Sequence, residues 1–314
     1  MTKVFIDGSV GTTGLRIYDR LSNRKDISLM TLSDDKRKDV NERRQMINSS
    51  DITFLCLPDD AAIEAVSLCD NGNTKIIDAS TAHRTNSDWS YGLPELSQAH
   101  RESIITSKRV AVPGCHASGF CAIVYPLIKS GILPSDYPIV SHSVTGYSGA
   151  GKSMISTYND PDRAIGLSSP GQYALGGDHK HQKEMTAICG LAHKPIFNPI
   201  IADFYSGMVV SVPLYTSLLK GNYNANKIHS FFEDYYKGEK VINVLPFNEK
   251  GMENGFLYAN ELSGKDNMQI LISGNDERIL IATRFCNLGK GASGAAIQCM
   301  NIIIGLDETT SLVI

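Results

Sequence analysis

The stretch Arg109-Val-Ala-Val-Pro-Gly-Cys-His-Ala-Ser-Gly119 decides how this chain folds around its chemistry. The apolar run Val110–Val112 predicts a buried strand, which Pro113-Gly114 ends. A helical apolar pattern follows directly, so Cys115 is expected on a sharp strand-to-helix turn at the positive end of a helix. Unpaired N–H groups and the helix dipole there favour a thiolate over a thiol. Most free cysteines are small buried hydrophobes, but this setting makes Cys115 a candidate nucleophile.

Length and composition are those of a globular protein with room for two domains. The chain has 314 residues, of which 42% are hydrophobic and 20% charged. A net charge of −3 gives no electrostatic reason to expect nucleic acid or an anionic membrane as a partner. No apolar stretch approaches the ~20 residues that span a bilayer, and no signal-peptide pattern precedes the first strand. We therefore expect a cytoplasmic protein.

The seven cysteines are an odd number spread over a long chain. Such usage is typical of free thiols in a reducing compartment rather than of a disulfide framework. No Cys-x-x-Cys pair occurs, so a structural zinc site is not expected, and we predict no bound metal.

A glycine loop opens the chain. The strand Lys3–Asp7 leads into Gly8-Ser-Val-Gly11-Thr-Thr-Gly14, and a helical pattern follows. Strand, glycine loop and helix form the setting of a dinucleotide-binding turn, in which glycines let the backbone approach a pyrophosphate. The spacing G-x-x-G-x-x-G differs from the commoner G-x-G-x-x-G, so a plain tight turn remains the alternative.

The end of the next predicted strand, Ile27–Leu32, bears on the choice of cofactor. An NAD site usually places an acidic residue there, and Asp34 is close. Ser33 and the basic residues around Arg37 instead suit a 2′-phosphate. The sequence therefore favours NADP(H), with a solvated basic loop as the alternative.

Strands and helices alternate up to Val112, which predicts a doubly wound parallel sheet of Rossmann type. Ligands of such sheets bind beyond the carboxyl ends of the strands. Four loops are expected there: Gly8–Gly14, Leu57–Asp60, Asp78–Arg84 and Pro113–Ser118. Within them, the fork of Arg84 is suited to a carboxylate or phosphate, although an exposed structural arginine is the commoner case.

The pattern changes after Cys115, where longer and more alternating strands predict an α+β domain with a mixed or antiparallel sheet. The β-rich segments are Pro138–Thr145, Met208–Pro213, Leu257–Asn260, Met268–Ser273 and Arg278–Phe285. A small-residue segment then leads into a last apolar helix, which we expect to return to the first domain. The predicted domains are therefore 1–114 plus about 290–314 for the cofactor, and 115–289 for catalysis, substrate and oligomerisation.

A pair of histidines opens another predicted helix. His179 and His181 are two residues apart, and Glu184 follows His181 by three. That spacing lets Glu184 lie beside His181 on one helical face and orient its ring. Histidines two apart on a helix point to different faces, which argues against a metal site.

Together, these motifs suggest a thiolate that attacks an activated acyl group, a nicotinamide that reduces the resulting thioester, and a histidine that carries protons. The chain resembles the shorter form of N-acetyl-γ-glutamyl-phosphate reductase, within the aspartate-semialdehyde dehydrogenase-like superfamily. Matching motifs run in order along nearly the whole chain, from Gly-Ser-Val-Gly-Thr-Thr-Gly through Val-Pro-Gly-Cys-His-Ala-Ser-Gly to Gly-Lys-Gly-Ala-Ser-Gly.

The resemblance implies the NADPH-dependent reduction of N-acetyl-L-glutamyl 5-phosphate to the 5-semialdehyde in arginine biosynthesis, by a homo-oligomer, as a dimer or tetramer. It implies Cys115 as the nucleophile and the His179-x-His181 motif as the acid–base group, with His181 preferred. Lys183 stands where the family motif has proline. It further implies substrate contacts at Arg84, Ser148 and Gly149, and cofactor contacts at Gly8, Ser9, Gly11, Thr12, Thr13, Gly14, Ser33, Arg37, Leu57, Pro58, Ser80, Gly291 and Ser293.

Three alternatives remain open at this point. A sister acyl-phosphate reductase, acting on aspartate semialdehyde or on carrier-bound aminoadipate, shares the cofactor domain and the cysteine. A cysteine hydrolase or acyltransferase needs no nicotinamide and leaves Gly8–Gly14 unexplained. A non-catalytic NADPH sensor explains that loop but not the thiol at Cys115.

Overall fold

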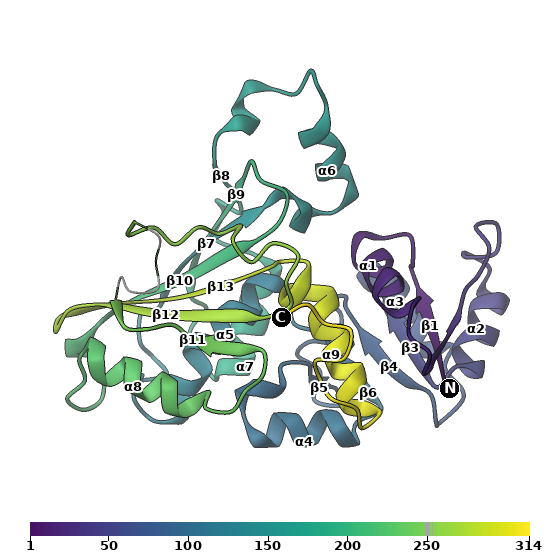
Figure 1. Ribbon diagram of the computed structural model, residues 1–314, viewed down its shortest axis with the longest axis horizontal. Helices are drawn as coiled ribbons and strands as arrows, with labels where there is room; N and C mark the ends of the chain where they lie inside the picture. The colour runs from purple at the N-terminus through teal and green to yellow at the C-terminus, as the bar shows by residue number, and fades with distance from the viewer. Residues whose placement is uncertain (249–251, 253) are drawn as a thin grey trace. The chain divides into compact units, whose positions relative to one another are not determined.

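A parallel sheet organises the first part of the chain, and a mixed sheet organises the second. The computed structural model describes residues 1–248, 252 and 254–314. It separates into unit 1, made of Met1–Gly114 and Ala292–Val313, and unit 2, made of Cys115–Gly291 with Ile314. Figure 1 shows the elements of each unit by colour along the chain. The α/β fold class predicted from the sequence is confirmed.

Unit 1 contains a six-stranded sheet in the order β2-β1-β3-β4-β6-β5, and every neighbouring pair is parallel. Its strands are β1 (Thr2–Asp7), β2 (Ile27–Met30), β3 (Ile52–Leu55), β4 (Lys75–Asp78), β5 (Ser90–Tyr91) and β6 (Arg109–Ala111). Its helices are α1 (Thr12–Leu21), α2 (Val40–Ser49), α3 (Asp59–Ser67), α4 (Gln98–Thr106) and α9 (Gly294–Ile303).

Helices cover both faces of this sheet. Side chains alternate between faces along a strand, so Val4 and Ile6 point to one side and Phe5 to the other. Val4 and Ile6 pack in one core cluster with residues of α1, α4 and α9. Phe5 packs in a second cluster with residues of α2 and α3. The sheet is therefore doubly wound, as the alternation of elements predicts.

The helix α9 comes late in the chain but is buried along its whole length in unit 1. Its amide side chains are held by segments that precede it and by the segment that follows it in the chain. Gln298 donates to Glu95 Oε1 at 2.6 Å and to Glu308 Oε2 at 2.7 Å, and Asn301 Oδ1 accepts from Arg24 at 2.6 Å. The segment that contains Glu95 thus helps to hold α9, a function that its sequence alone does not reveal.

Unit 2 contains a seven-stranded mixed sheet in the order β11-β12-β13-β10-β7-β9-β8. Its strands are β7 (Val140–Gly146), β8 (Gly171–Gln172), β9 (Ile196–Ala202), β10 (Met208–Tyr215), β11 (Ile242–Val244), β12 (Met268–Gly274) and β13 (Arg278–Phe285). Its helices are α5 (Cys115–Lys129), α6 (Lys152–Asn159), α7 (Lys180–Cys189) and α8 (Ala225–Tyr235). Helix α5 packs on β10, β13 and α7, which brings the N-terminal segment of α5 near the helix that carries the histidine motif.

One predicted strand is wrong. Leu257–Asn260 carries a strand-like apolar pattern, but the structure forms turns there. Asn254 and Gly255 have positive φ angles of 52° and 80°, and Ser263 N–H donates to Asn260 as in a turn. The reversal of the backbone therefore overrides the local preference for a strand.

Among the described residues, no helix combines the length and the apolar character that crossing a bilayer requires.

Candidate active site

Cys115 is the first residue of α5 and follows β6 after three residues, as the sequence predicts. Every residue from His116 to Leu127 is buried, which fixes the helix firmly within unit 2. The Cys115 side chain itself is only partly buried. The fold therefore presents this sulfur at the N-terminal end of a rigidly held helix, where the helix dipole favours negative charge.

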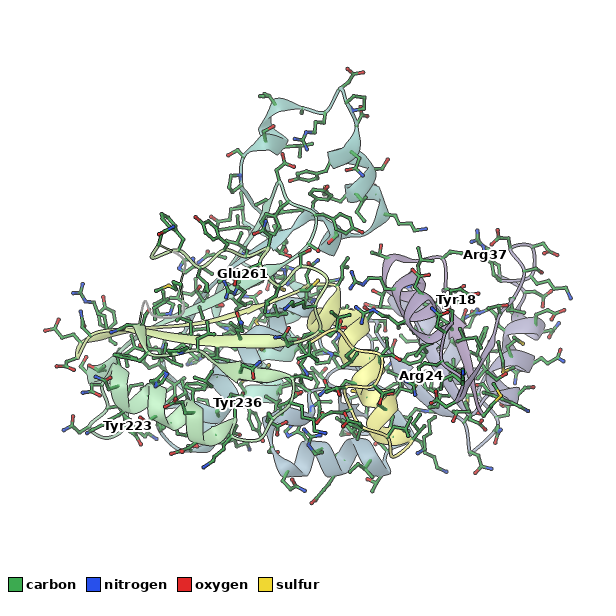
Figure 2. All side chains as sticks on the ribbon, in the orientation of Figure 1. Tyr18, Arg24, Arg37, Tyr223, Tyr236 and Glu261 are labelled. Atoms are coloured by element: carbon green, nitrogen blue, oxygen red, sulfur yellow. The ribbon has the colours of Figure 1, made fainter. Side chains whose placement is uncertain are left out.

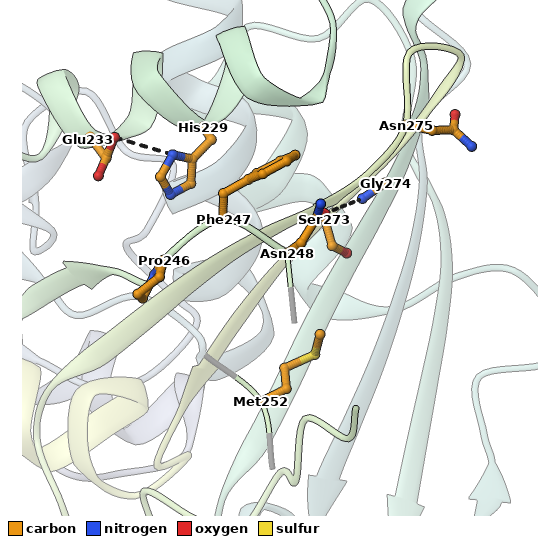
Figure 3. Close-up of a pocket in the computed structure, with 9 residues that line it drawn as sticks. All are labelled: His229, Glu233, Pro246, Phe247, Asn248, Met252, Ser273, Gly274 and Asn275. Carbon is orange, nitrogen blue, oxygen red and sulfur yellow. Dashed lines mark hydrogen bonds and ion pairs between the residues drawn. The ribbon is translucent and has the colours of Figure 1, made fainter. Parts of the chain in front are cut away.

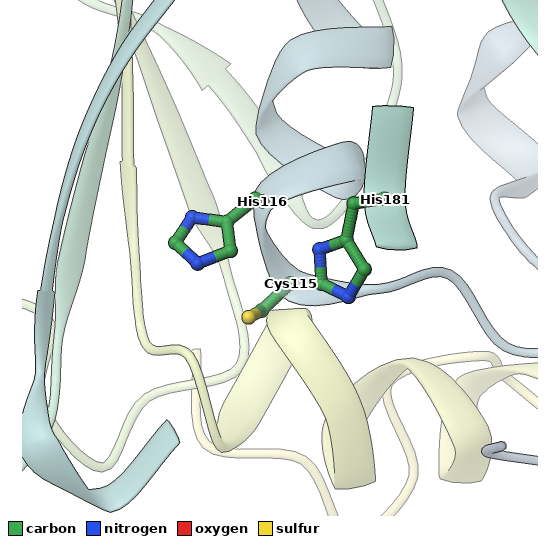
Figure 4. A group of neighbouring side chains, drawn as sticks. All are labelled: Cys115, His116 and His181. Carbon is green, nitrogen blue, oxygen red and sulfur yellow. The ribbon is translucent and has the colours of Figure 1, made fainter. Parts of the chain in front are cut away.

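Two histidines flank the sulfur. One ligand atom each of Cys115, His116 and His181 lie within 4.8 Å of one another, and Figure 4 shows both imidazole rings beside the thiol. His181 is 5% exposed and comes from the first turn of α7. Glu184, one turn further along the same helix, is also buried. The candidate nucleophile and a candidate acid–base group therefore meet within unit 2.

His116 is held at both ring nitrogens. Its Nδ1 lies 2.7 Å from Ser143 Oγ, and its Nε2 lies 2.8 Å from the Tyr173 hydroxyl. Burial lowers the pKa of His116 to about 3, and the nearby His179 and Lys180 add to the effect. His116 is therefore neutral near pH 7 and fixed in orientation.

His179 has a different function in the structure. It is the N-cap of α7, where its Nδ1 accepts from the His181 N–H at 3.1 Å and its own N–H donates to Gln182 Oε1 at 2.7 Å. Burial, with Lys180, lowers the pKa of His179 to about 4. Because Nδ1 acts as an acceptor, the imidazole is neutral with its proton on Nε2. His179 thus stabilises the helix that carries His181.

The donor types in this cluster, one thiolate and two imidazoles, are those that zinc prefers. However, hydrogen bonds already occupy both nitrogens of His116. A metal would have to break one of these bonds before it could bind that ring. The arrangement therefore fits proton handling better than metal binding.

The predicted residue Gly291 packs against Cys115. It lies in the π-helical turn Gly289–Ser293, and a Cβ built on it would stand 2.9 Å from the Cβ of Cys115. Short π-helical segments often occur at functional sites. A side chain larger than that of glycine would push on Cys115, so this glycine is needed for close approach.

Ser148 and Gly149 lie in a second polar group of unit 2. The Ser148 hydroxyl accepts from Asn287 Nδ2 at 3.0 Å, and Asn287 Oδ1 accepts from the Gly207 N–H at 2.8 Å. Ser148 is 1% exposed. Asn287 thus ties the Ser148 loop to the end of β10, a connection that the sequence does not predict.

The glycine loop of unit 1 has the geometry of a dinucleotide turn. Gly8 has a φ angle of 89°, and a Cβ there would overlap the Cys56 carbonyl oxygen. A Cβ on Gly14 would overlap the Gly8 carbonyl oxygen. Gly11 is the N-cap of α1 and offers no side-chain cap, so the first N–H groups of α1, including those of Thr12 and Thr13, are suited to a phosphate. The loop therefore fits a pyrophosphate-containing cofactor.

Three loops at the carboxyl edge of the parallel sheet are joined by hydrogen bonds. Asp59, which follows Leu57-Pro58 at the start of α3, accepts from the Thr81 N–H at 2.8 Å. Arg84 is 8% exposed and donates to the carbonyl oxygens of Val112 at 2.9 Å and Ala79 at 3.1 Å. The Arg84 guanidinium is therefore partly committed to holding the loops after β4 and β6.

Asp78 organises the loop that contains Ser80. Its buried carboxylate accepts from the Ser80 N–H at 2.9 Å, from the Ser80 hydroxyl at 2.7 Å and approaches His83 Nδ1 at 2.7 Å. The His83 ring in turn stacks on Trp89, with 4.1 Å between ring centroids. The Ser80 backbone at the sheet edge is therefore held in one conformation.

Ser33 and Arg37 lie together in an exposed turn after β2, where Ser33 O accepts from the Arg37 N–H at 3.0 Å. The Ser33 hydroxyl bonds to Asp35 and holds the pKa of that carboxyl below its usual value. Arg37, labelled in Figure 2, lies 3.5 Å from Asp34. Both cationic and anionic groups are thus present in the turn that the sequence predicts to contact the cofactor 2′-position. Ser293 is buried at the start of α9, in the same unit.

Sequence reasoning missed three residues around Cys115: His116, Ser143 and Tyr173. A histidine within the mostly apolar, buried stretch His116–Leu127 was an available signal for His116. Ser143 is one of several small polar residues on β7, and Tyr173 lies in a loop without pattern. Only the fold brings the three together.

A separate pocket of unit 2 contains none of the predicted residues. It is lined by His229, Glu233, Pro246, Phe247, Asn248, Met252, Ser273, Gly274 and Asn275 (Figure 3). His229 Nδ1 lies 3.2 Å from Glu233, and Nε2 lies 2.8 Å from the Leu245 carbonyl oxygen. Because both nitrogens are engaged, this imidazole is held in place by the fold.

Comparison with known proteins places both units in described families. Residues 3–104 match the semialdehyde dehydrogenase NAD binding domain, and residues 115–287 match the semialdehyde dehydrogenase dimerisation domain. Among solved structures, aspartate semialdehyde dehydrogenase from Francisella tularensis aligns with a TM-score of 0.73 at 17% identity, covering 97% of this chain and 100% of that one. The enzyme from Candida albicans, solved with NADP, aligns with a TM-score of 0.68 at 14% identity, covering 97% and 98%. These structures establish the fold.

Curated relatives are more similar in sequence. The protein named N-acetyl-gamma-glutamyl-phosphate reductase 2 of Nostoc sp. is 46% identical over 99% of both chains. The protein of the same name from Pseudomonas putida is 42% identical over 96% of both chains. Similarity at this level along the full length, with Cys115 at the start of α5, establishes that the chain belongs to the N-acetyl-gamma-glutamyl-phosphate reductase family.

Proposed function

We propose that this protein reduces N-acetyl-L-glutamyl 5-phosphate with NADPH, giving N-acetyl-L-glutamate 5-semialdehyde, phosphate and NADP⁺. The observation that carries the proposal is the half-buried Cys115 sulfur at the start of α5, with His181 beside it, in a chain 46% identical to a reductase of that name. The reaction belongs to the biosynthesis of arginine.

The Cys115 thiolate attacks the acyl carbon and forms a thioester, while the acyl–phosphate bond breaks and phosphate leaves with the electron pair. NADPH, when bound at the Gly8–Gly14 loop, supplies the hydride that reduces the thioester carbonyl. The C–S bond then breaks to release the aldehyde and restore the thiolate. Backbone N–H groups at the start of α5 stabilise the oxyanion at each addition.

His181 is the proposed acid–base group. It stands within the cluster around the Cys115 sulfur, whereas Nδ1 of His179 is engaged as the cap of α7. His181 takes the thiol proton before attack, protonates the oxygen that receives negative charge during reduction, and takes that proton back as the C–S bond breaks. Glu184, buried on the same helix, is proposed to orient the His181 ring.

Cofactor binding is proposed at the edge of the parallel sheet. The glycine loop, Leu57-Pro58 and Ser80 hold the pyrophosphate and nicotinamide portions, while Ser33 and Arg37 contact the 2′-phosphate. Gly291 and Ser293 complete the proposed set. Arg84, Ser148 and Gly149 are the proposed contacts of the substrate.

We also propose a homo-oligomer that forms through the mixed sheet. Residues 115–287 match a dimerisation domain, and one face of the sheet carries exposed apolar side chains on three strands. Ile196 is 61% exposed, Tyr215 59% and Leu280 39%. A second copy of this chain would cover that face. Light scattering should report a dimer or tetramer, and Leu280→Glu should shift it towards monomer; a monomeric wild-type protein would refute this part.

The test of the reaction runs it backwards, because the acyl phosphate is labile. The protein is mixed with N-acetylglutamate 5-semialdehyde, phosphate and NADP⁺, and the ultraviolet absorbance of NADPH is followed. Phosphate-dependent growth of that absorbance is expected. A signal with aspartate semialdehyde alone would move the protein to the sister reductases, and no signal with either aldehyde would refute the proposed reaction. Replacing NADP⁺ by NAD⁺ tests the cofactor preference.

A further inference from the structure

A chain of hydrogen bonds leads from the middle of β7 towards Cys115. Ser143 is fully buried, and its hydroxyl lies 2.7 Å from His116 Nδ1. His116 is 3% exposed, and its Nε2 lies 2.8 Å from the Tyr173 hydroxyl. His116 and Tyr173 are thus connected by hydrogen bonds to the interior of the mixed sheet.

Ser143 decides which nitrogen of His116 carries the proton. Within the described part of the chain, His116 Nδ1 is the one hydrogen-bond partner of the Ser143 hydroxyl. A hydroxyl has a single proton to donate, and a buried donor left unpaired costs more than an unused lone pair. Ser143 therefore donates to Nδ1, and the neutral imidazole carries its own proton on Nε2.

The tautomer of His116 in turn directs Tyr173. Since Nε2–H donates to the phenolic oxygen, the Tyr173 proton must point away from His116. Burial raises the pKa of Tyr173, and the nearby Cys115 raises it further, so the phenol stays protonated in the physiological range. The Tyr173 hydroxyl is bonded to Nε2 of His116, and a nitrogen of the same ring lies within 4.8 Å of the Cys115 sulfur. The phenolic donor is therefore available near that sulfur.

We propose that Ser143 and His116 are positioning residues that aim the Tyr173 hydroxyl as a hydrogen-bond donor at the negative charge of the reaction centre at Cys115. A charge on the sulfur requires loss of the thiol proton but no substrate. The charge on the attacked carbonyl oxygen rests on the proposed function. No proton is transferred by Tyr173; it stabilises charge through a hydrogen bond, as donors of an oxyanion hole do.

Steady-state kinetics test whether Ser143 acts through Tyr173. Tyr173→Phe removes the donor and should lower kcat about 10- to 100-fold with little change in KM, since the lost bond is to a charged group. Ser143→Ala lets the His116 proton reside on either ring nitrogen, so the Tyr173 hydroxyl is no longer held in one orientation. This variant should lower kcat about 3- to 10-fold. If Ser143 acts through Tyr173, adding Ser143→Ala to Tyr173→Phe should cause no further loss. Independent, multiplying losses would overturn the proposal.

Ser141 provides a matched control two residues away on the same strand. It is fully buried like Ser143, but its hydroxyl has no hydrogen-bond partner among the described residues. Ser141→Ala should leave kcat and KM unchanged. Thermal unfolding of both serine variants separates loss of fold from loss of positioning, and equal kinetic losses in the two would overturn the proposal.

Alkylation provides a readout that does not depend on the proposed reaction. The rate at which iodoacetamide modifies Cys115 at neutral pH, followed by peptide mass spectrometry, reports thiolate formation. Tyr173→Phe should slow this rate about 10-fold, and Ser141→Ala should leave it unchanged. An unchanged rate in Tyr173→Phe would refute donation to the sulfur even in a protein without reductase activity. A slower rate in a protein inactive with both aldehydes would refute the proposed function alone.

Discussion

At its glycine loop, unit 1 offers mainly backbone: the loop leaves no room for a Cβ at Gly8, and the first N–H groups of α1 lie beside it. Around Cys115, unit 2 instead offers side chains, with His116 buried and bonded at both nitrogens. The first arrangement recognises the shape and charge common to dinucleotides. The second fixes single atoms for proton and charge transfer. Binding and chemistry in this protein should therefore respond to different substitutions.

Cys115→Ser should show the largest difference between its effect on turnover, which depends on unit 2, and its effect on NADPH binding, which depends on unit 1. The hydroxyl is a far weaker nucleophile, so turnover should fall by at least about 10⁴-fold, while NADPH binding through the glycine loop stays intact. Reductase assays and NADPH fluorescence titration measure the two effects. Near-wild-type turnover would rule out the covalent mechanism, and loss of NADPH binding would show that recognition is not confined to unit 1.

His181→Asn should lower turnover by about 10²–10⁴-fold without affecting NADPH binding, because an amide cannot exchange protons with the substrate. His179→Asn is the matched control, since asparagine is itself a good N-cap and preserves the start of α7. Steady-state kinetics of both variants decide between the two rings. A loss of less than about fivefold in His181→Asn, with a larger one in His179→Asn, would move the acid–base role to His179.

Gly8→Ala should affect the backbone site instead. The new Cβ would meet the Cys56 carbonyl oxygen in a conformation that L residues rarely adopt, costing about 1–3 kcal/mol of stability. The distorted loop should raise the KM for NADPH about tenfold or more. Gly72→Ala, where a Cβ meets nothing within 4 Å, is the control. An unchanged KM for NADPH in Gly8→Ala would remove this loop from the cofactor site.

Lowering the pH should reduce the free energy of unfolding of unit 2, because His116 is buried in its neutral form. Its pKa is about 3 in the folded chain against 6.5 for an ordinary histidine, so between these values the unfolded chain binds a proton that the native one does not. The contribution to stability is complete above pH 6.5 and is lost as pH falls, by about 1.4 kcal/mol per pH unit. Denaturant unfolding at several pH values should show that the free energy of unfolding falls less steeply with decreasing pH in His116→Gln than in the wild type. An identical dependence on pH would show that His116 does not cause this loss of stability.

Five of the six strands of the parallel sheet were predictable because each is a short apolar run between turn signals, and Cys115 was predictable because Pro113-Gly114 separates strand from helix. The short strand β5 (Ser90–Tyr91) has no such run and was not predicted. The strand predicted at Leu257–Asn260 was wrong because positive φ angles just before it turn the chain. The Asn254-Gly255 dipeptide signals a turn, but it does not show whether a strand follows that turn.

The environment of Cys115 could be predicted only in part. His181 belongs to a motif, whereas Ser143 and Tyr173 are adjacent to His116 only through the pairing of β7 with β9 and of β9 with β8. Arg84 has the charge of an anion ligand, but its bonds to Val112 and Ala79 come from contacts that composition does not reveal. Long-range packing decides these details.

The position of α9 has a consequence for how the protein is made. This helix supplies a buried layer of unit 1 from residues 294–303, yet the strands that it covers are synthesised near the beginning. On the ribosome, the part of the sheet face beneath α9 must wait until residues 294–303 have emerged, while unit 2, which is continuous from Cys115 to Gly291, can already fold. A premature stop before α9 would leave that part of the face exposed and open to aggregation.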